Sequence, residues 1–215
     1  MNIVTINVGL PREIPWRGTT VRTSIFKAPV SGRVQVRRLN VDGDEQADLK
    51  VHGGADKAVY VYPSEHYVFW RDELPGIDLS WGAFGENFTT EGLLEETIHI
   101  GDRLRIGAAE FIVTQPRMPC FKLGLRFNRP DMVKRFLLSG RIGFYLRVSQ
   151  EGEVTASAAV MIIARDVDAL SVADIVRLYT ADSANQDLLR RASEVTALPD
   201  GWRDYFRQRL WEPDA

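Results

Sequence analysis

Short apolar runs separated by glycine and proline make up most of the chain, from its start to about residue 165. The runs are rich in β-branched and aromatic residues, a composition typical of β-strands. Clear examples lie at residues 34–36, 58–62, 103–106, 111–114 and 144–148. Many short strands with turn residues between them predict a β-barrel or a β-sandwich.

Two helices are predicted to interrupt these strands. The first begins at Ser64, which follows Pro63 and can cap a helix N-terminus with its hydroxyl. The second follows Pro130, a residue suited to the first turn of a helix, and ends near Gly140, which tolerates the left-handed conformation found after helices. Strands therefore dominate this region, but its class is α+β.

The pattern changes after Asp166, where apolar residues recur at helical spacing. Ser171 and Asp174 have the spacing of a capping box with an acidic third residue. Pro199 and Gly201 lie between the last two helical segments. The predicted helices cover residues 172–179, 188–195 and 202–210.

These patterns predict two domains, a mainly β barrel with interrupting helices at residues 1–165 and a small three-helix domain at residues 166–215. Apolar stripes of helical period usually form packing surfaces. We therefore expect the three-helix domain to serve packing or formation of a homodimer and to carry no chemistry itself.

The composition is within the ordinary range for soluble globular proteins. Hydrophobic residues make up 45% and charged residues 26%, and the net charge of −2 gives no basic surplus for nucleic acid. Residues 1–8 lack the features of a secretory signal, and no apolar run reaches membrane-spanning length. We therefore expect a cytoplasmic protein that binds neither nucleic acid nor membranes.

Several common types of functional site are excluded by their missing motifs. The three histidines lie far apart, and no His-Glu-x-x-His helix is present, so a zinc site is not expected. The chain has neither a P-loop nor the Gly-x-Ser-x-Gly turn of serine hydrolases. One cysteine cannot form an internal disulfide or hold an iron–sulfur cluster on four protein thiolates.

That cysteine, Cys120, lies in a segment rich in prolines and cations. Pro119 stiffens the loop, and Arg117 and Lys122 would favour the thiolate over the thiol. A thiolate is a soft ligand that suits a transition metal. The alternative is an inert, buried cysteine, and the residues alone leave both interpretations open.

A glycine pair precedes a lysine in the segment that begins at His52. Gly53 and Gly54 would let backbone N–H groups turn toward an anion, and His52 or Lys57 could add side-chain donors. An ordinary glycine turn between strands is the alternative.

Two further segments carry polar groups suited to a ligand. Glu86 and Asn87 could pair with the amino and amide edge of a pterin, or they could cap a turn. Ser24 and Lys27 suit a phosphate, although a solvated strand edge would have the same composition.

Taken together and in order, these segments resemble the MOSC family, and most closely its bacterial YiiM type. The tail after Asp166 resembles the small helical domain that follows the MOSC domain in that group, so the resemblance covers nearly the whole chain. The segments that carry it are VDGDEQAD (41–48), HGGADKA (52–58), YPSEHY (62–67), FGENF (84–88), IGD (100–102) and QPRMPCFK (115–122).

The resemblance implies a mostly β barrel that binds the molybdenum cofactor, with Cys120 as the molybdenum ligand. It also implies a set of phosphate and pterin contacts, carried over by position. These are Ser24, Lys27, His52, Gly53, Gly54, Lys57, Glu86, Asn87, Arg117 and Lys122.

Related proteins reduce N-hydroxylated purine bases such as 6-hydroxylaminopurine, hydroxylamines and amidoximes to amines or amidines, so the resemblance implies such a reductase. Some relatives carry a fused ferredoxin-like module, which is not seen before the chain ends at Ala215. Electrons are therefore expected from a separate flavin or iron–sulfur reductase. The proton donor stays open among Asp56, His52 and Glu86.

Three other functions fit the same residues. The protein could carry the molybdenum cofactor without turnover, or it could transfer sulfur through a persulfide on Cys120. Alternatively, Cys120 could be structural and the barrel a plain binding module.

Overall fold

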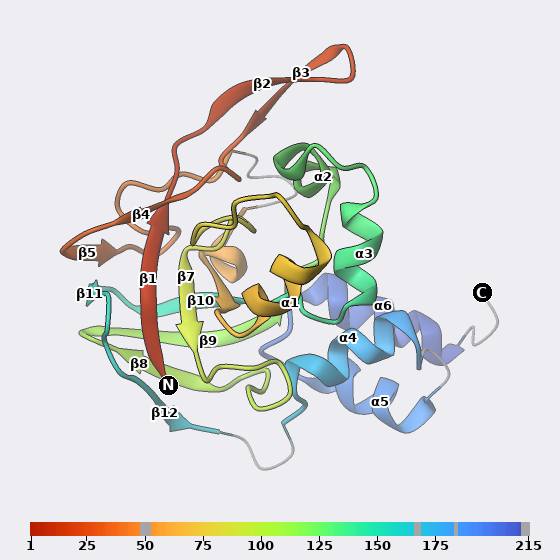
Figure 1. Cartoon of the computed structure of the whole chain (residues 1–215). Helices are drawn as coiled ribbons and strands as arrows, with labels where there is room; N and C mark the ends of the chain where they lie inside the picture. Colours follow the sequence, from red (N-terminus) through yellow and green to blue (C-terminus); the bar gives the residue numbers. More distant parts are fainter. Residues whose placement is uncertain (48–52, 166–168, 183–184, 212–215) are drawn as a thin grey trace.

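The chain folds around a large curved sheet that helices cover on one side (Figure 1). This computed structural model describes residues 1–47, 53–165, 169–182 and 185–211. All neighbouring strands in the sheet are antiparallel except β6 and β7, which are parallel. In spatial order the eight strands are β12 (Val160–Ala164), β8 (Arg103–Ile106), β9 (Ala109–Pro116), β10 (Phe144–Gln150), β6 (Val59–Pro63), β7 (Phe88–Glu91), β1 (Asn2–Val8) and β4 (Ala28–Val30).

Two pairs of strands lie outside the large sheet. Strands β5 (Arg33–Val36) and β11 (Gly152–Thr155) form one of them. Strands β2 (Arg12–Trp16) and β3 (Thr19–Thr23) form a hairpin that extends away from the body of the molecule (Figure 1).

The predicted α+β class is confirmed, but the predicted barrel is not: no closed barrel is found among the described residues. The start of β1 meets the chain just before β12, where Ile3 N–H donates to the Ala158 carbonyl (2.9 Å) and Val160 N–H to the Met1 carbonyl (3.0 Å). From Ile6 onward, the same strand pairs with β4 instead. Among the described residues, the ladder of strands is therefore strongly curved but not closed.

Of the three α-helices in the described part of the β region, two were predicted, with small shifts. Helix α1 (His66–Glu73) begins two residues after Ser64, because the Ser64 N–H still bonds to the sheet at the Thr90 carbonyl (2.7 Å). Helix α3 (Met132–Leu138) follows Pro130 and ends before Gly140, which has φ +67°. Helix α2 (Phe121–Phe127) was not predicted and begins directly after Cys120.

The three C-terminal helices are present as predicted. They are α4 (Val172–Thr180), α5 (Gln186–Glu194) and α6 (Asp200–Trp211). The Ser171 hydroxyl accepts from Asp174 N–H, and the Asp174 carboxylate accepts from Ser171 N–H, so the capping box is formed (3.0 Å each). None of the helices in the described part of the chain is both long and apolar enough to cross a bilayer.

A cluster of buried aromatic rings supports the loops on one side of the sheet. Tyr62 contacts Phe84 with ring centroids 4.7 Å apart, and Trp70 stacks on Phe136 at 5.5 Å. Trp70 Nε1 also donates to the Tyr62 hydroxyl (2.7 Å). Edge and stacked contacts of this kind fix the positions of the rings, and Phe136 in turn lies beneath Arg117.

Candidate functional site

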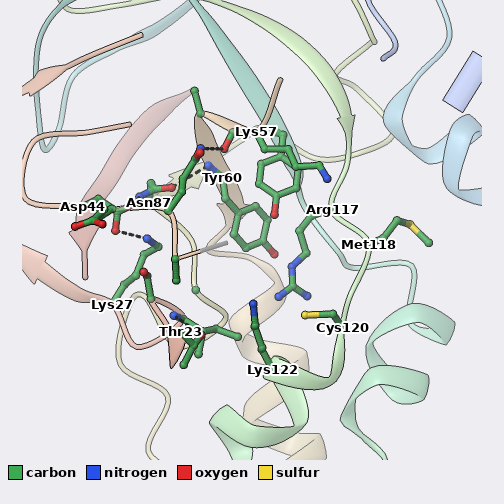
Figure 2. Close-up of a pocket in the computed structure, with 18 residues that line it drawn as sticks. Thr23, Lys27, Asp44, Lys57, Tyr60, Asn87, Arg117, Met118, Cys120 and Lys122 are labelled. Atoms are coloured by element: carbon green, nitrogen blue, oxygen red, sulfur yellow. Dashed lines mark hydrogen bonds and ion pairs between the residues drawn. The ribbon is translucent and has the colours of Figure 1, made fainter. Parts of the chain in front are cut away.

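A pocket of about 120 Å³ opens beside Cys120 (Figure 2). Its walls come from segments far apart in the sequence, including the loop after β3, the turn before β6 and the loop between β9 and α2. The lining residues are Thr23, Ser24, Ile25, Lys27, Asp44, Glu45, Gln46, Ala47, Lys57, Ala58, Tyr60, Gly85, Asn87, Arg117, Met118, Cys120, Lys122 and Tyr145.

The loop that carries Cys120 is held at both ends. Cys120 has an extended backbone (φ −126°, ψ 175°), and its carbonyl accepts from Leu123 N–H (2.9 Å) at the start of α2. At the other end, Arg117 N–H donates to the Gly143 carbonyl (3.1 Å). Gly143 has φ +67°, and a Cβ there would lie 2.3 Å from the Val61 carbonyl oxygen, so this position requires glycine. Cys120 is therefore partly exposed on a loop whose backbone is hydrogen-bonded at both ends.

Arg117 is a buried cation beside that sulfur. Its guanidinium lies 5.3 Å from the ring centroids of both Tyr60 and Phe136, and Tyr145 lines the same pocket. Burial by itself would lower the pKa of Arg117, but the facing phenols and the Cys120 sulfur outweigh it and raise the pKa. The guanidinium therefore stays charged.

Two buried donors of this pocket lack a hydrogen-bond partner within the described residues, namely Nη1 of Arg117 and the hydroxyl of Ser24. Buried polar groups in native proteins are nearly always hydrogen-bonded. In Figure 2 the Arg117 guanidinium, the Cys120 sulfur and the Lys122 ammonium point toward one another. This end of the pocket therefore suits an anionic ligand that also contacts sulfur.

The opposite end of the pocket contains a buried ion pair. Lys27 Nζ bonds to Asp44, and both side chains are over nine-tenths buried. Asp44 also accepts from Gly9 N–H (2.9 Å) and from Asn87 Nδ2 (2.8 Å). Burial lowers the pKa of Lys27, and the attraction of Asp44 opposes this effect only in part. Asn87 Oδ1 accepts from Tyr60 N–H (3.0 Å), which ties this end to β6.

The structure gathers most of the predicted site residues in this pocket, namely Ser24, Lys27, Lys57, Asn87, Arg117, Cys120 and Lys122. Gly53 and Gly54 line a neighbouring pocket instead. His52 lies outside the described residues. The sequence analysis missed Asp44, Tyr60 and Tyr145; both tyrosines lie in apolar strand segments that resemble core.

Glu86 does not line the pocket beside Cys120. Its side chain is fully buried, and its carboxylate accepts from the backbone N–H of Gly82 (2.9 Å) and Phe84 (3.1 Å) and from the hydroxyls of Tyr67 and Thr89. The structure thus matches the turn-capping alternative, because a carboxylate so occupied has no open side for a pterin. Burial raises the pKa of Glu86.

Asp56, another candidate proton donor, also lies away from Cys120. Its Oδ1 accepts from Arg147 Nε (2.6 Å), and the residue lines the neighbouring pocket. Of the three acids considered from the sequence, the structure brings neither Asp56 nor Glu86 to the pocket beside Cys120.

Comparison with known proteins identifies the family. A model of the MOSC domain matches residues 48–161, and a model of the YiiM-like, 3-alpha helix domain matches residues 170–211. This chain belongs to the MOSC family.

Several curated relatives of this MOSC protein match along most of its length. It is 40% identical over 208 residues to "Uncharacterized protein YflK" of Bacillus subtilis, covering 97% of this chain and 94% of that one. It is 34% identical over 189 residues to "Protein YiiM" of Escherichia coli, covering 87% and 84%. A protein named "Reductase" from Gibberella moniliformis is 35% identical over 198 residues, which span 90% of this chain but 35% of that longer protein.

Solved MOSC structures have the same architecture. The crystal structure of YiiM from Geobacillus stearothermophilus superposes with a TM-score of 0.81 at 37% identity, over 97% of this chain and 98% of that chain. YiiM from Escherichia coli gives 0.79 at 26% identity, over 100% and 94%.

Proposed function

We propose that this MOSC protein binds the molybdenum cofactor beside Cys120 and reduces N-hydroxylated compounds to amines or amidines. The observation that carries the proposal is the buried guanidinium of Arg117, whose Nη1 lacks a partner within the described residues and which faces the single thiol of the chain. The family and the relative named "Reductase" support the same assignment.

The residues of the pocket fit such a cofactor. Cys120 offers a soft thiolate ligand, and Arg117 Nη1 and the Ser24 hydroxyl are buried donors that an anionic group would satisfy. The volume of about 120 Å³ is below the roughly 300–1,000 Å³ of ordinary small-molecule sites. The pocket would therefore enclose one end of the cofactor, and the rest of the cofactor would extend out through the pocket opening.

The side chains have separate tasks in this proposal. Cys120 holds the metal, and Arg117 stabilises the thiolate and neutralises negative charge next to it. Lys122 adds a second cation at the same end. When bound, the cofactor supplies the two electrons that cleave the N–O bond.

Proton delivery falls to the chain itself. Cleavage of the N–O bond consumes two protons and releases water with the amine or amidine. Tyr145 lines the pocket together with Arg117 and Cys120, and its hydroxyl is protonated at neutral pH, although burial raises its pKa and so makes it a weaker acid. We therefore propose Tyr145 as a proton donor in place of Asp56 and Glu86.

Electrons would come from a separate protein. The chain has one cysteine, which this proposal uses for the metal, so it cannot also anchor an iron–sulfur cluster on four thiolates. A flavin or iron–sulfur reductase is the expected partner.

The decisive experiment is metal analysis of protein produced in a cofactor-competent host supplied with molybdate. Wild-type protein should contain stoichiometric molybdenum and reduce 6-hydroxylaminopurine with a supplied electron donor. Cys120→Ala should lose both molybdenum and activity with little change in thermal unfolding, since its side chain is small and partly exposed. Met118→Leu, at another lining residue of similar volume, is the matched control and should keep both.

The same experiment separates the other functions. Wild-type protein without molybdenum would contradict the proposal, and molybdenum without turnover would favour a cofactor carrier. An extra sulfur atom on Cys120, found by mass spectrometry of metal-free protein, would favour sulfur transfer.

A further inference from the structure

A buried acid–base pair lies behind the loop that carries Arg117, and the proposed function does not use it. His66 Nε2 lies 2.7 Å from Glu95 Oε2, and the two side chains are 9% and 2% exposed. His66 comes from the segment YPSEHY (62–67), one of those that carry the family resemblance. A buried carboxylate is costly unless it is paired and hydrogen-bonded, so the partners of Glu95 indicate what the pair stabilises.

The second oxygen of Glu95 holds the backbone that in turn holds Arg117. Gly143 N–H donates to Glu95 Oε1 (2.7 Å), and the Gly143 carbonyl accepts from Arg117 N–H (3.1 Å). Glu95 is therefore linked through a single glycine to the backbone of Arg117, whose guanidinium points toward the Cys120 sulfur (Figure 2). A shift of the Glu95 carboxylate would move Gly143 and, with it, the base of the arginine side chain.

Two tyrosines of β6 hold the loop between α3 and β10 one and two residues earlier. The Tyr62 hydroxyl donates to the Arg141 carbonyl (3.0 Å), and the Tyr60 hydroxyl donates to the Ile142 carbonyl (2.8 Å). Three consecutive residues of this loop are thus each bonded by a buried side chain. Glu95 differs from the tyrosines because it bonds to the residue that contacts the arginine, and a carboxylate acceptor makes the stronger bond.

We propose that Glu95 is a positioning residue that keeps the guanidinium of Arg117 directed at the sulfur of Cys120. His66 fixes the same carboxylate from its other oxygen. The Nη1 of Arg117 lacks a hydrogen-bond partner within the described residues, so its direction has to be set by the backbone and the surrounding rings. A cation that is oriented before its ligand arrives stabilises negative charge without reorganisation. The importance of Glu95 for catalysis rests on the reductase function proposed above.

The position of Arg117 is measurable through the reactivity of Cys120. This is the single cysteine of the chain, so a thiol reagent modifies one site. Iodoacetate and iodoacetamide alkylate the same thiolate, but only iodoacetate is an anion. The ratio of the two rates reports positive charge beside the sulfur, because the thiolate fraction and the exposure of the sulfur affect both rates alike. Full-length protein produced without the cofactor gives this ratio independently of any reductase activity.

The test compares substitutions of Glu95. Glu95→Leu removes the acceptor of Gly143 N–H and should lower the iodoacetate-to-iodoacetamide ratio about threefold or more, toward the value for Arg117→Met. Glu95→Gln keeps a carbonyl acceptor for Gly143 and a polar group for His66, so it should retain the wild-type ratio. Glu95→Asp is one methylene shorter and cannot reach both partners. It should also lower the ratio, and it replaces Glu95→Leu if that variant does not fold.

Asp102 provides the matched control for loss of a buried carboxylate. Its side chain is fully buried, accepts from His99 N–H (2.9 Å) and pairs with Arg165. None of these three residues lines the pocket beside Cys120. Asp102→Leu should lower the thermal stability and leave the rate ratio unchanged. An equal fall of the ratio in Asp102→Leu and Glu95→Leu would reflect general loosening and would overturn the positioning role.

Activity measurements keep this inference apart from the reductase proposal. In molybdenum-containing protein, Glu95→Leu should lower kcat for 6-hydroxylaminopurine per bound molybdenum about tenfold, and Glu95→Gln should restore it. Wild-type protein without molybdenum would overturn the reductase and leave the alkylation result intact. A wild-type alkylation ratio in both Glu95→Leu and Glu95→Asp would overturn the positioning role, even in a protein that contains molybdenum and is active.

Discussion

The carboxylate of Glu86 is enclosed in the protein interior. It accepts hydrogen bonds from two backbone N–H groups and two hydroxyls. Phe84 N–H donates to Oε2 (3.1 Å), and Gly82 N–H and two hydroxyls donate to Oε1. In Glu86→Gln, one oxygen becomes an NH₂ group that faces a donor, so a buried hydrogen bond is lost. We expect denaturant titration to show a free energy of unfolding lower by about 1–3 kcal/mol, with unchanged molybdenum content.

An opposite result would be informative for the same residue. If Glu86→Gln left stability unchanged but reduced the molybdenum content, Glu86 would contact the cofactor, as the family resemblance first implied. Thr89→Val is a matched control, because it removes one donor to the same carboxylate without placing a donor opposite Phe84.

Lys27 gives the protein a pH-dependent stability. Its pKa is lowered by burial in the folded state, so between the folded value and the ordinary lysine value of 10.5 the unfolded chain binds more protons. The contribution of Lys27 to the free energy of unfolding is therefore most favourable above pH 10.5. It is lost as pH falls through the folded pKa of Lys27. Relative to wild type, Lys27→Met should show a flatter rise of unfolding free energy with pH from neutral toward that value, measured by denaturant titration. Equal slopes in the two proteins would contradict a lowered pKa.

Site residues could be predicted from the sequence where their partners lie nearby along the chain. They could not be predicted where their partners lie far away in the sequence. Cys120 and Arg117 were found because the loop that holds them is continuous in sequence. Asp44 was missed because its role depends on Lys27 and Asn87, which only folding brings to it. Lys27 was predicted to bind phosphate, yet the structure pairs it with a carboxylate that local sequence could not reveal.

Among the elements, α4 is stabilised at its start by a capping box. Ser171→Ala removes the side-chain acceptor of Asp174 N–H (3.0 Å), and we expect the free energy of unfolding to fall by about 1 kcal/mol. Ser171→Asn keeps a side-chain acceptor at this position and should recover most of the loss. Equal denaturation midpoints for Ser171→Ala and wild type would show that the cap contributes nothing to the folded protein.

Elements with strong local signals were predicted well, and those specified by tertiary contacts were not. The three C-terminal helices have clear periodicity and caps, and each was predicted. Helix α2 has seven residues with Gly124 inside it, a pattern with little helical preference, and Gly124 fits because a Cβ there would lie 3.0 Å from the Arg129 carbonyl oxygen. Strand β4 pairs along the edge of β1, and the sheet stays open there. No local sequence pattern predicts this pairing.

For the molecule as a whole, the sequence changes from a strand pattern to a helix pattern near residue 165. In the structure, however, the two parts are joined by many contacts. The backbone of Val172 bonds to Ile98 (2.9 Å), and that of Leu170 to Ile100 (2.8 Å). The side chains of Val172 and Ile175 are fully buried. Separate family models match residues 48–161 and 170–211, and these contacts predict strong coupling between the two parts.

We therefore expect the full-length protein to unfold in one cooperative transition. Scanning calorimetry should give equal calorimetric and van't Hoff enthalpies, because the helices cannot leave the sheet without exposing the buried side of α4. A chain of residues 1–165 should unfold at a lower temperature, since the surface under α4 would then face water. If the full chain instead gave two transitions, one of them at the midpoint of the shortened chain, residues 1–165 and 166–215 would be thermodynamically independent domains. In that case the anchoring of Trp202 on Gln115 would contribute nothing to the stability of the sheet.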